Sequence, residues 1–251
     1  MDQLLVALDV ETATKAAALA DALRGVAGGF KIGSRLFTAE GPSIVRTLVE
    51  KGDRVFLDLK FHDIPNTVAQ AVAAATSLGV WMFNVHASGG TKMMQAARDA
   101  ANEAAARARL QPPIVIAVTI LTSLNAPALD EVGLGAGPVL DRALRLAELT
   151  KAAGLDGVVA SAQETAAIRQ RCGAGFKIVT PGIRGGGAGA AGTDDQKRTM
   201  GPREAIAAGA SYIVVGRPVI AAADPREAAR RITDEMRSAD LRDSSVILPS
   251  R

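Results

Sequence analysis

Cysteine and aromatic residues are scarce in this chain. Its 251 residues include one cysteine, Cys172, two histidines and an aromatic fraction of 3%. A single cysteine excludes an intrachain disulfide bond and any cysteine-rich metal site. With so few aromatic rings, a core built from the 48% of residues that are hydrophobic must be filled by aliphatic side chains. Such a core is more typical of parallel strands covered by helices than of an all-β sandwich.

Long apolar segments and basic clusters are missing as well. No apolar stretch reaches the roughly 18 residues of a membrane span, and no basic run with interleaved aromatic residues indicates nucleic-acid binding. The net charge is only +3, from 29 basic and 26 acidic residues. A strand-like run follows Gln3 directly, without the pattern of a secretory signal. We therefore expect a cytoplasmic enzyme that binds neither membranes nor nucleic acids.

Short apolar runs alternate with longer amphipathic segments along the chain. The longer ones have helical periodicity, as in Ala13–Arg24, Ser43–Lys51 and Val139–Ala153. This alternation predicts βαβ units and a parallel sheet, either closed as a single (β/α)8 TIM barrel or open and doubly wound. We favour the closed α/β barrel. The eight predicted strands are Leu4–Leu8, Phe30–Gly33, Val55–Leu59, Met82–His86, Ile114–Thr119, Gly157–Ala160, Phe176–Thr180 and Tyr212–Val215.

The chain shows no linker that would divide it into domains. We expect residues 1–237 to form one catalytic barrel domain and residues 238–251, which lose periodicity, to form a C-terminal extension. The glycine- and alanine-rich segment Gly185–Gly192 has little side chain with which to pack. It is predicted to be either a surface loop or a mobile lid.

Charged residues stand where several predicted strands end. Asp9 follows the first strand, Lys31 lies in the second, and Asp58 and Lys60 belong to the third, with Asp63 shortly after it. Active sites of barrels lie at the carboxyl ends of the strands, and charges on apolar strands are costly unless paired or used. Because side chains alternate along a strand, Asp58 and Lys60 should face the same way. Salt bridges at the mouth of the barrel are the simpler alternative.

The sequence resembles the orotidine 5′-monophosphate decarboxylase family from Leu4 to about Pro218. The matching segments are Val6–Asp9, Phe30–Gly33, Phe56–Thr67, Val85–Ala87, Leu121–Ser123, Thr180–Arg184, Asp195–Gln196 and Val215–Pro218. The resemblance implies conversion of orotidylate (orotidine 5′-phosphate) to UMP and CO2 in de novo pyrimidine biosynthesis, without a metal or other cofactor. It also implies a homodimer with shared active sites. The glycine-rich segment departs from the family pattern.

The resemblance assigns roles to the matching residues. Lys60 would stabilise the carbanion at C6 and protonate it, and Asp58 would crowd the departing carboxylate. Lys31 and Asp63 complete an alternating array of lysine and aspartate, with Asp63 and Thr67 reaching into the partner's site. The substrate-binding residues implied are Asp9, Lys31, Ile64, Thr67, Thr122, Arg184, Gln196, Gly216 and Arg217.

These binding residues divide by the part of the substrate they would contact. Asp9, with help from Lys31 and Thr67, is expected at the ribose hydroxyls. Loops after the last two strands of a barrel often bind phosphate, which suits Arg184, Gly216 and Arg217. Gln196 would reach phosphate and base, and Thr122 the pyrimidine edge. Two simpler interpretations stay open, in which Thr122 caps the following segment and Arg184 is a surface charge.

The two histidines are predicted to support the site rather than to act in catalysis. His62 should point away from Asp58 and Lys60, and His86 ends the fourth strand, where it could hydrogen-bond to residues of the site.

Three other functions are weighed. A related barrel lyase acting on a keto-sugar phosphate also carries Asp-x-Lys-x-x-Asp, but with an acidic metal ligand where this chain has Lys31, whose charge repels Mg2+. A phosphopentose epimerase would need more histidine ligands than two. A non-catalytic phosphate-binding barrel would have no need of Lys60 or Asp58.

Overall fold

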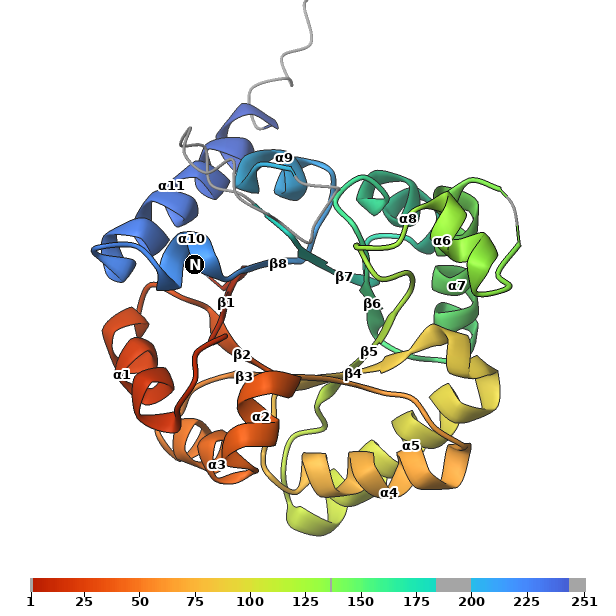
Figure 1. The fold of residues 1–251 in the computed structure, drawn as a ribbon, viewed down its shortest axis with the longest axis horizontal. Coiled ribbons are helices and arrows are strands. Elements are labelled where there is room, and N and C mark those ends of the chain that lie inside the picture. The colour runs from red at the N-terminus through yellow and green to blue at the C-terminus, as the bar shows by residue number, and fades with distance from the viewer. Residues whose placement is uncertain (1, 136, 184–199, 244–251) are drawn as a thin grey trace, which may run out of the picture.

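Eight parallel strands close into a barrel in chain order, β1 to β8, with helices around the outside (Figure 1). The computed structural model describes residues 2–135, 137–183 and 200–243. The predicted (β/α)8 barrel is therefore confirmed, and the open doubly wound sheet is excluded. The strands are β1 (Leu4–Ala7), β2 (Gly29–Gly33), β3 (Val55–Phe61), β4 (Met82–His86), β5 (Ile114–Val118), β6 (Gly157–Val159), β7 (Lys177–Pro181) and β8 (Tyr212–Val215).

The helices form a ring outside the strands (Figure 1). Local sequence explains where two of them start. Thr12 accepts a hydrogen bond from the backbone amide of Lys15 and caps the start of the first helix, and Pro65 is the first residue of the fourth. The helices are α1 (Ala13–Leu23), α2 (Ser34–Glu40), α3 (Ser43–Glu50), α4 (Pro65–Thr76), the short 3-10 helix η1 (Ala87–Gly89), α5 (Gly90–Ala108), α6 (Ala126–Glu131), α7 (Val139–Ala152), α8 (Thr165–Cys172), α9 (Pro202–Ala207), α10 (Arg217–Ile220) and α11 (Pro225–Asp243). None of them is both long and apolar enough to cross a bilayer within the described ranges.

The inside of the barrel is a packed core rather than a channel. Alternate strand residues fill it, while the residues between them pack against the helices. Trp81 and Tyr212 pack edge to face beside this cluster, with ring centroids 5.2 Å apart. Substrate must therefore meet the barrel at its end. The buried interior residues are Leu5, Ala7, Phe56, Met82, Ile116, Val179 and Val214.

The last helix runs past the predicted domain boundary. α11 continues without a break from Pro225 through Ser238 to Asp243, so the boundary between residues 237 and 238 lies inside a helix. Residues 244–251 of the expected extension lie outside the described residues. The same holds for Gly185–Gly192, Arg184 and Gln196.

Candidate active site

Two lysines and two aspartates meet at the carboxyl ends of β1, β2 and β3. Lys60 Nζ lies 2.7 Å from Asp58 Oδ1, and Lys31 Nζ lies 3.5 Å from Asp58 Oδ2 and 3.1 Å from Asp9 Oδ1. The side chains of Lys31 and Asp58 are only 11% and 13% exposed, whereas that of Lys60 is 34% exposed. The buried carboxylate of Asp58 thus stands between two cations, one of which is open to a ligand. The side chains of Asp58 and Lys60 point toward the same place, as predicted.

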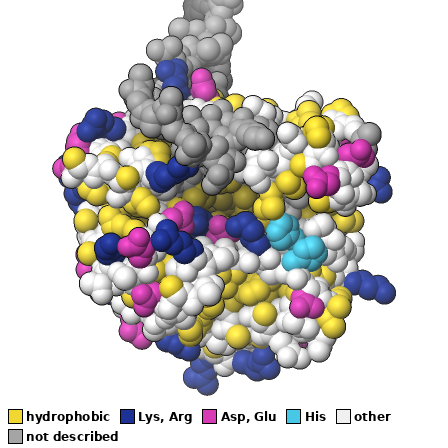
Figure 2. Space-filling view, viewed as in Figure 1, with side chains coloured by type: hydrophobic (Ala, Val, Ile, Leu, Met, Phe, Trp, Pro, Cys, Tyr) yellow, Lys and Arg dark blue, Asp and Glu magenta, His cyan; other side chains and the backbone are white. Residues whose placement is uncertain are grey.

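This array lies in a hollow over the barrel. Figure 2 shows Lys, Arg, Asp and Glu side chains gathered at the centre of this face, with His side chains beside them. Charge and burial coincide here with the end of the barrel at which barrel enzymes bind their substrates.

Two glycines lie against the array and show how closely its parts are packed. A Cβ atom on Gly33 would be 3.0 Å from Lys31 Nζ and 3.4 Å from Asp9 Oδ1. A Cβ atom on Gly216 would be 3.6 Å from Asp9 Oδ2. The turn that leads from β8 to Arg217, the first residue of α10, therefore lies beside Asp9.

The backbone of Lys60 has a conformation that sequence reasoning missed. Its φ is +54°, in the left-handed region, which costs a non-glycine residue about 1 kcal/mol. The Lys60 amide donates to Asn84 Oδ1 at 2.8 Å, and Asn84 Nδ2 donates to Asp58 Oδ1 at 2.7 Å. Asn84 was predicted only as part of the fourth strand. Its one signal in the sequence is a polar residue inside the apolar run Met82–His86.

Asp63 lies apart from the other members of the predicted Lys-Asp-Lys-Asp array. In the described part of the chain, the polar contact of its side chain is with its neighbour, because Asp63 Oδ1 accepts from the Ile64 amide at 2.6 Å. Asp63, Ile64 and Thr67 are all exposed, and Ile64 is 66% exposed. One copy of the chain thus brings Lys31, Asp58 and Lys60 together and leaves Asp63 outside.

Thr122 and Arg217 occupy exposed or partly exposed turns at the same end of the barrel. Thr122 follows β5, and the next helix, α6, is capped by Asn125, whose Oδ1 accepts from the Ala128 amide at 3.2 Å. Asn125, and not Thr122, therefore caps α6. Arg217 is exposed at the start of α10.

The two histidines stand next to each other at the edge of the array. Their ring centroids are 5.3 Å apart; His62 is exposed and His86 is partly buried. Burial, together with the nearby charges of His62 and Lys60, lowers the pKa of His86 to about 4. His86 is therefore neutral at neutral pH. Within the described ranges its side chain has no hydrogen bond, so the predicted one is not found there.

We expect His86→Gln to reduce the loss of stability that acid causes. In the unfolded chain a histidine gains its proton near pH 6.5, while folded His86 gains it only near pH 4, so acid favours unfolding between these values. Between pH 7 and pH 4, the free energy of unfolding should fall by on the order of 1 to 2 kcal/mol less in the variant than in the wild type. This figure is reduced because the ring is partly exposed.

Urea unfolding at pH 7 and at pH 4 measures this difference. His62→Gln is the matched control and should keep most of the acid loss, because burial of His86, the largest cause, is unchanged. Equal acid losses in His86→Gln and the wild type would contradict the prediction.

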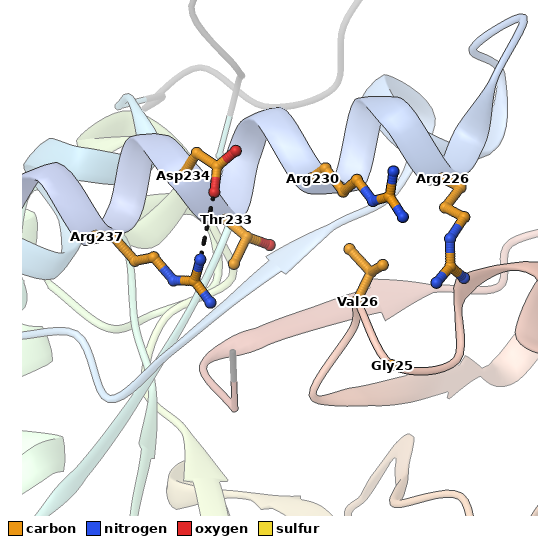
Figure 3. A pocket seen from close by; sticks show the side chains of 7 residues that line it. All are labelled: Gly25, Val26, Arg226, Arg230, Thr233, Asp234 and Arg237. Carbon is orange, nitrogen blue, oxygen red and sulfur yellow. Dashed lines mark hydrogen bonds and ion pairs between the residues drawn. The ribbon is translucent and has the colours of Figure 1, made fainter.

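A pocket on the outer wall does not compete with this site. It lies between α11 and the turn after α1, at the amino ends of the strands (Figure 3). Two of its three arginines have local partners: Arg226 Nη1 donates to the carbonyl oxygen of Ala22 at 2.6 Å, and Arg237 Nη1 lies 3.5 Å from Asp234 Oδ1. Among all the residues that the structure describes, no group of three His, Cys, Asp or Glu side chains is placed to hold a metal ion.

Comparison with known proteins identifies the family. The model of the Orotidine 5′-phosphate decarboxylase / HUMPS family matches residues 2–232. The chain belongs to this family. An orotidine 5′-phosphate decarboxylase of Syntrophotalea carbinolica is 52% identical over 237 residues, which cover 94% of this chain and 96% of that protein. One of Sodalis glossinidius is 52% identical over 232 residues, covering 92% and 89%.

A solved structure agrees with this assignment. The crystal structure of orotidine 5′-phosphate decarboxylase from Lactobacillus acidophilus matches with a TM-score of 0.82 at 34% sequence identity. The match covers 94% of this chain and 99% of that one. The family predicted from the motifs is confirmed.

Proposed function

We propose that this chain is an orotidine 5′-monophosphate decarboxylase, which converts orotidylate to UMP and CO2. The observation that carries the proposal is the array in which Asp58 contacts Lys60 at 2.7 Å and Lys31 at 3.5 Å, at the carboxyl end of the barrel. The relatives described above bear the name of this activity and match nearly the whole chain.

Lys60 supplies the chemistry at C6. Breaking the bond from C6 to the carboxylate leaves an electron pair on C6, where no adjacent carbonyl or iminium group accepts it. An ammonium group fixed beside C6 lowers the energy of this carbanion more than that of the substrate. As CO2 leaves, the proton of Lys60 Nζ is transferred to C6 and forms the C–H bond of UMP. Lys60 then regains a proton from solvent.

Asp58 acts on the carboxylate that departs. Two like charges about 4 Å apart repel by about 4 kcal/mol at an effective dielectric constant of 20. Loss of CO2 removes this repulsion, so it favours the transition state over the bound substrate. Lys31 and Lys60 lie on either side of Asp58, at 3.5 Å and 2.7 Å, and their positive charges offset its negative charge.

The other end of the nucleotide provides the binding energy. We place the ribose hydroxyls at Asp9 and Lys31, whose side chains are 3.1 Å apart, with the partner's Thr67 in support. Gly216 lies beside Asp9, so the 5′-phosphate fits at Gly216 and Arg217. Thr122 is assigned to the pyrimidine edge. Arg184 is assigned to the phosphate, and Gln196 to the phosphate and the base, from the sequence alone, since both lie outside the described residues.

We expect Arg217→Ala to lower kcat/KM for orotidylate by about 100-fold, the range of a charge-assisted pair with a phosphate. The same substitution should change turnover of orotidine, which lacks the phosphate, by less than about threefold. Steady-state kinetics on both substrates measures the two effects. Arg231→Ala, on the outer wall at α11 where Arg231 pairs with Glu227, is the control and should leave both unchanged. Equal losses on orotidylate and orotidine would contradict a phosphate role.

The homodimer with shared sites is part of the proposal. The consecutive residues 62–67 are all exposed at the mouth of the barrel, and they include Ile64, an apolar side chain that a second copy would cover. Asp63 and Thr67 lie on this strip, and in the described part of the chain neither side chain has a hydrogen bond or ion pair to the array. A twofold partner would bring its own strip over the array and complete it. A cytoplasmic location is also proposed, in keeping with a single, buried and free cysteine.

Lys31 separates this function from the keto-sugar phosphate lyases. Its ammonium group holds Asp9 and Asp58 together at the position where those lyases were expected to carry an acidic metal ligand. A cation in that place favours an anionic substrate over Mg2+.

The test is to mix the purified protein with orotidylate in the presence of EDTA and to follow the ultraviolet absorbance of the pyrimidine. We expect conversion to UMP, with one CO2 released per substrate. A parallel assay with a keto-sugar phosphate and Mg2+ should show no turnover. No conversion of orotidylate by the folded chain would overturn the proposed function.

A further inference from the structure

The third strand does not pair regularly with the fourth. Leu57 of β3 is aligned with Phe83 of β4, and Phe61 with Val85. Between these pairs β3 has three residues, whereas β4 has one, Asn84. The two extra residues form a bulge in β3. The bulged segment contains Lys60, which acts on C6 in the proposed reaction, and Asp58, which acts on the carboxylate.

At the bulge, the side chain of Asn84 makes hydrogen bonds to β3 in place of the regular backbone pairing of the two strands. It is completely buried between Phe83 and Val85, and an amide in such a place is costly unless its polar atoms are bonded. Its Oδ1 accepts from the backbone amide of Lys60 at 2.8 Å. Its Nδ2 donates to Asp58 Oδ1 at 2.7 Å. A backbone N–H requires an acceptor and a carboxylate requires a donor, so these partners fix the orientation of the amide.

One side chain thus holds both halves of the catalytic pair. Asp58 Oδ1, which receives the Asn84 amide, is the same oxygen that Lys60 Nζ approaches to 2.7 Å. The bond to the Lys60 amide keeps that residue in its left-handed conformation, which sets the direction in which its side chain leaves the strand. Bulges of this kind are known to redirect side chains next to active sites.

We propose that Asn84 is a positioning residue for decarboxylation: it fixes the bulge of β3 and thereby aims Lys60 at C6. The proposal rests on the proposed function. The ribose and the phosphate are assigned to Asp9, Gly216 and Arg217, and Asn84 has no role in binding either of them. Its loss should therefore lower kcat and leave KM for orotidylate nearly unchanged.

The experiment is steady-state kinetics of Asn84→Leu, which keeps the volume and removes both hydrogen bonds. We expect kcat to fall about 100-fold, the effect of displacing a reacting group by about 1 Å, with KM changed less than about threefold. Thr119→Val is the matched control, because Thr119, like Asn84, is a buried polar residue. It directly follows β5, and its Oγ1 is hydrogen-bonded to the Val159 carbonyl at 3.1 Å. It should lower the melting temperature comparably and keep kcat within about threefold.

A second variant covers the case in which Asn84→Leu does not fold. Asn84→Asp has the same shape and retains the acceptor for the Lys60 amide, but turns an oxygen instead of an NH2 group toward Asp58. It should show the same loss in kcat without a matching rise in KM. A kcat in the folded variants no lower than that of Thr119→Val, or a KM that rises as much as kcat falls, would overturn the positioning role. Absence of turnover by the wild type would instead overturn the proposed function, and this role with it.

Discussion

Replacing Lys60 with alanine should lower kcat for orotidylate by at least about 10⁴-fold, because one substitution removes both the charge that stabilises the carbanion and the proton donor. Lys31 cannot take over, since its ammonium group lies on the other oxygen of Asp58 and also contacts Asp9. Turnover measured over hours at high enzyme concentration gives the size of the loss.

The barrel of this variant should remain folded. Asp58 keeps Lys31 and Asn84 as partners, so no buried carboxylate is left alone. Alanine adopts the left-handed conformation at position 60 no more easily than lysine does, so the backbone cost is unchanged. Circular dichroism and thermal unfolding check the fold. Lys15→Ala on α1, which removes an exposed lysine paired with Glu11, should match the wild type in turnover. Near-normal turnover of Lys60→Ala would rule out the mechanism.

The sequence predicted the strands well because their signal is local. Met82–His86 and Tyr212–Val215 match β4 and β8 residue for residue, since an apolar run between polar segments needs no partner to be recognised. The charged positions at the strand ends followed from the same pattern, and Asp9, Lys31, Asp58 and Lys60 indeed meet.

The third strand shows where such prediction stops. It was predicted to end at Leu59 but runs to Phe61 through the bulge, with Lys60 in a left-handed conformation. Nothing near Lys60 in the sequence indicates this, because a positive φ suggests glycine or asparagine and not lysine. The group that stabilises it, Asn84, is 24 residues away and is brought there only by the pairing of β3 with β4. A contact between residues so far apart in the chain produces no periodic pattern in the sequence from which it could be predicted.

Mixing the inactive variants Lys60→Ala and Asp63→Ala, unfolded and refolded together, should restore roughly a quarter of the wild-type activity. If Asp63 serves the partner's site, a mixed dimer has one site with both lesions and one built only from wild-type residues. Random pairing of equal amounts makes half of the dimers mixed, and half of their sites are intact. The exposed position of Asp63, away from Lys31, Asp58 and Lys60 of its own chain, is the structural reason to expect this.

The design has a control in which recovery is impossible. Asp58 and Lys60 belong to one chain and are 2.7 Å apart, so mixing Lys60→Ala with Asp58→Ala leaves one lesion in every site of a mixed dimer. That mixture should stay inactive, as should each variant refolded alone. Differently tagged chains show that mixed dimers have formed. If they form and Lys60→Ala with Asp63→Ala also stays inactive, Asp63 acts within its own chain and the exposed strip at residues 62–67 needs another explanation.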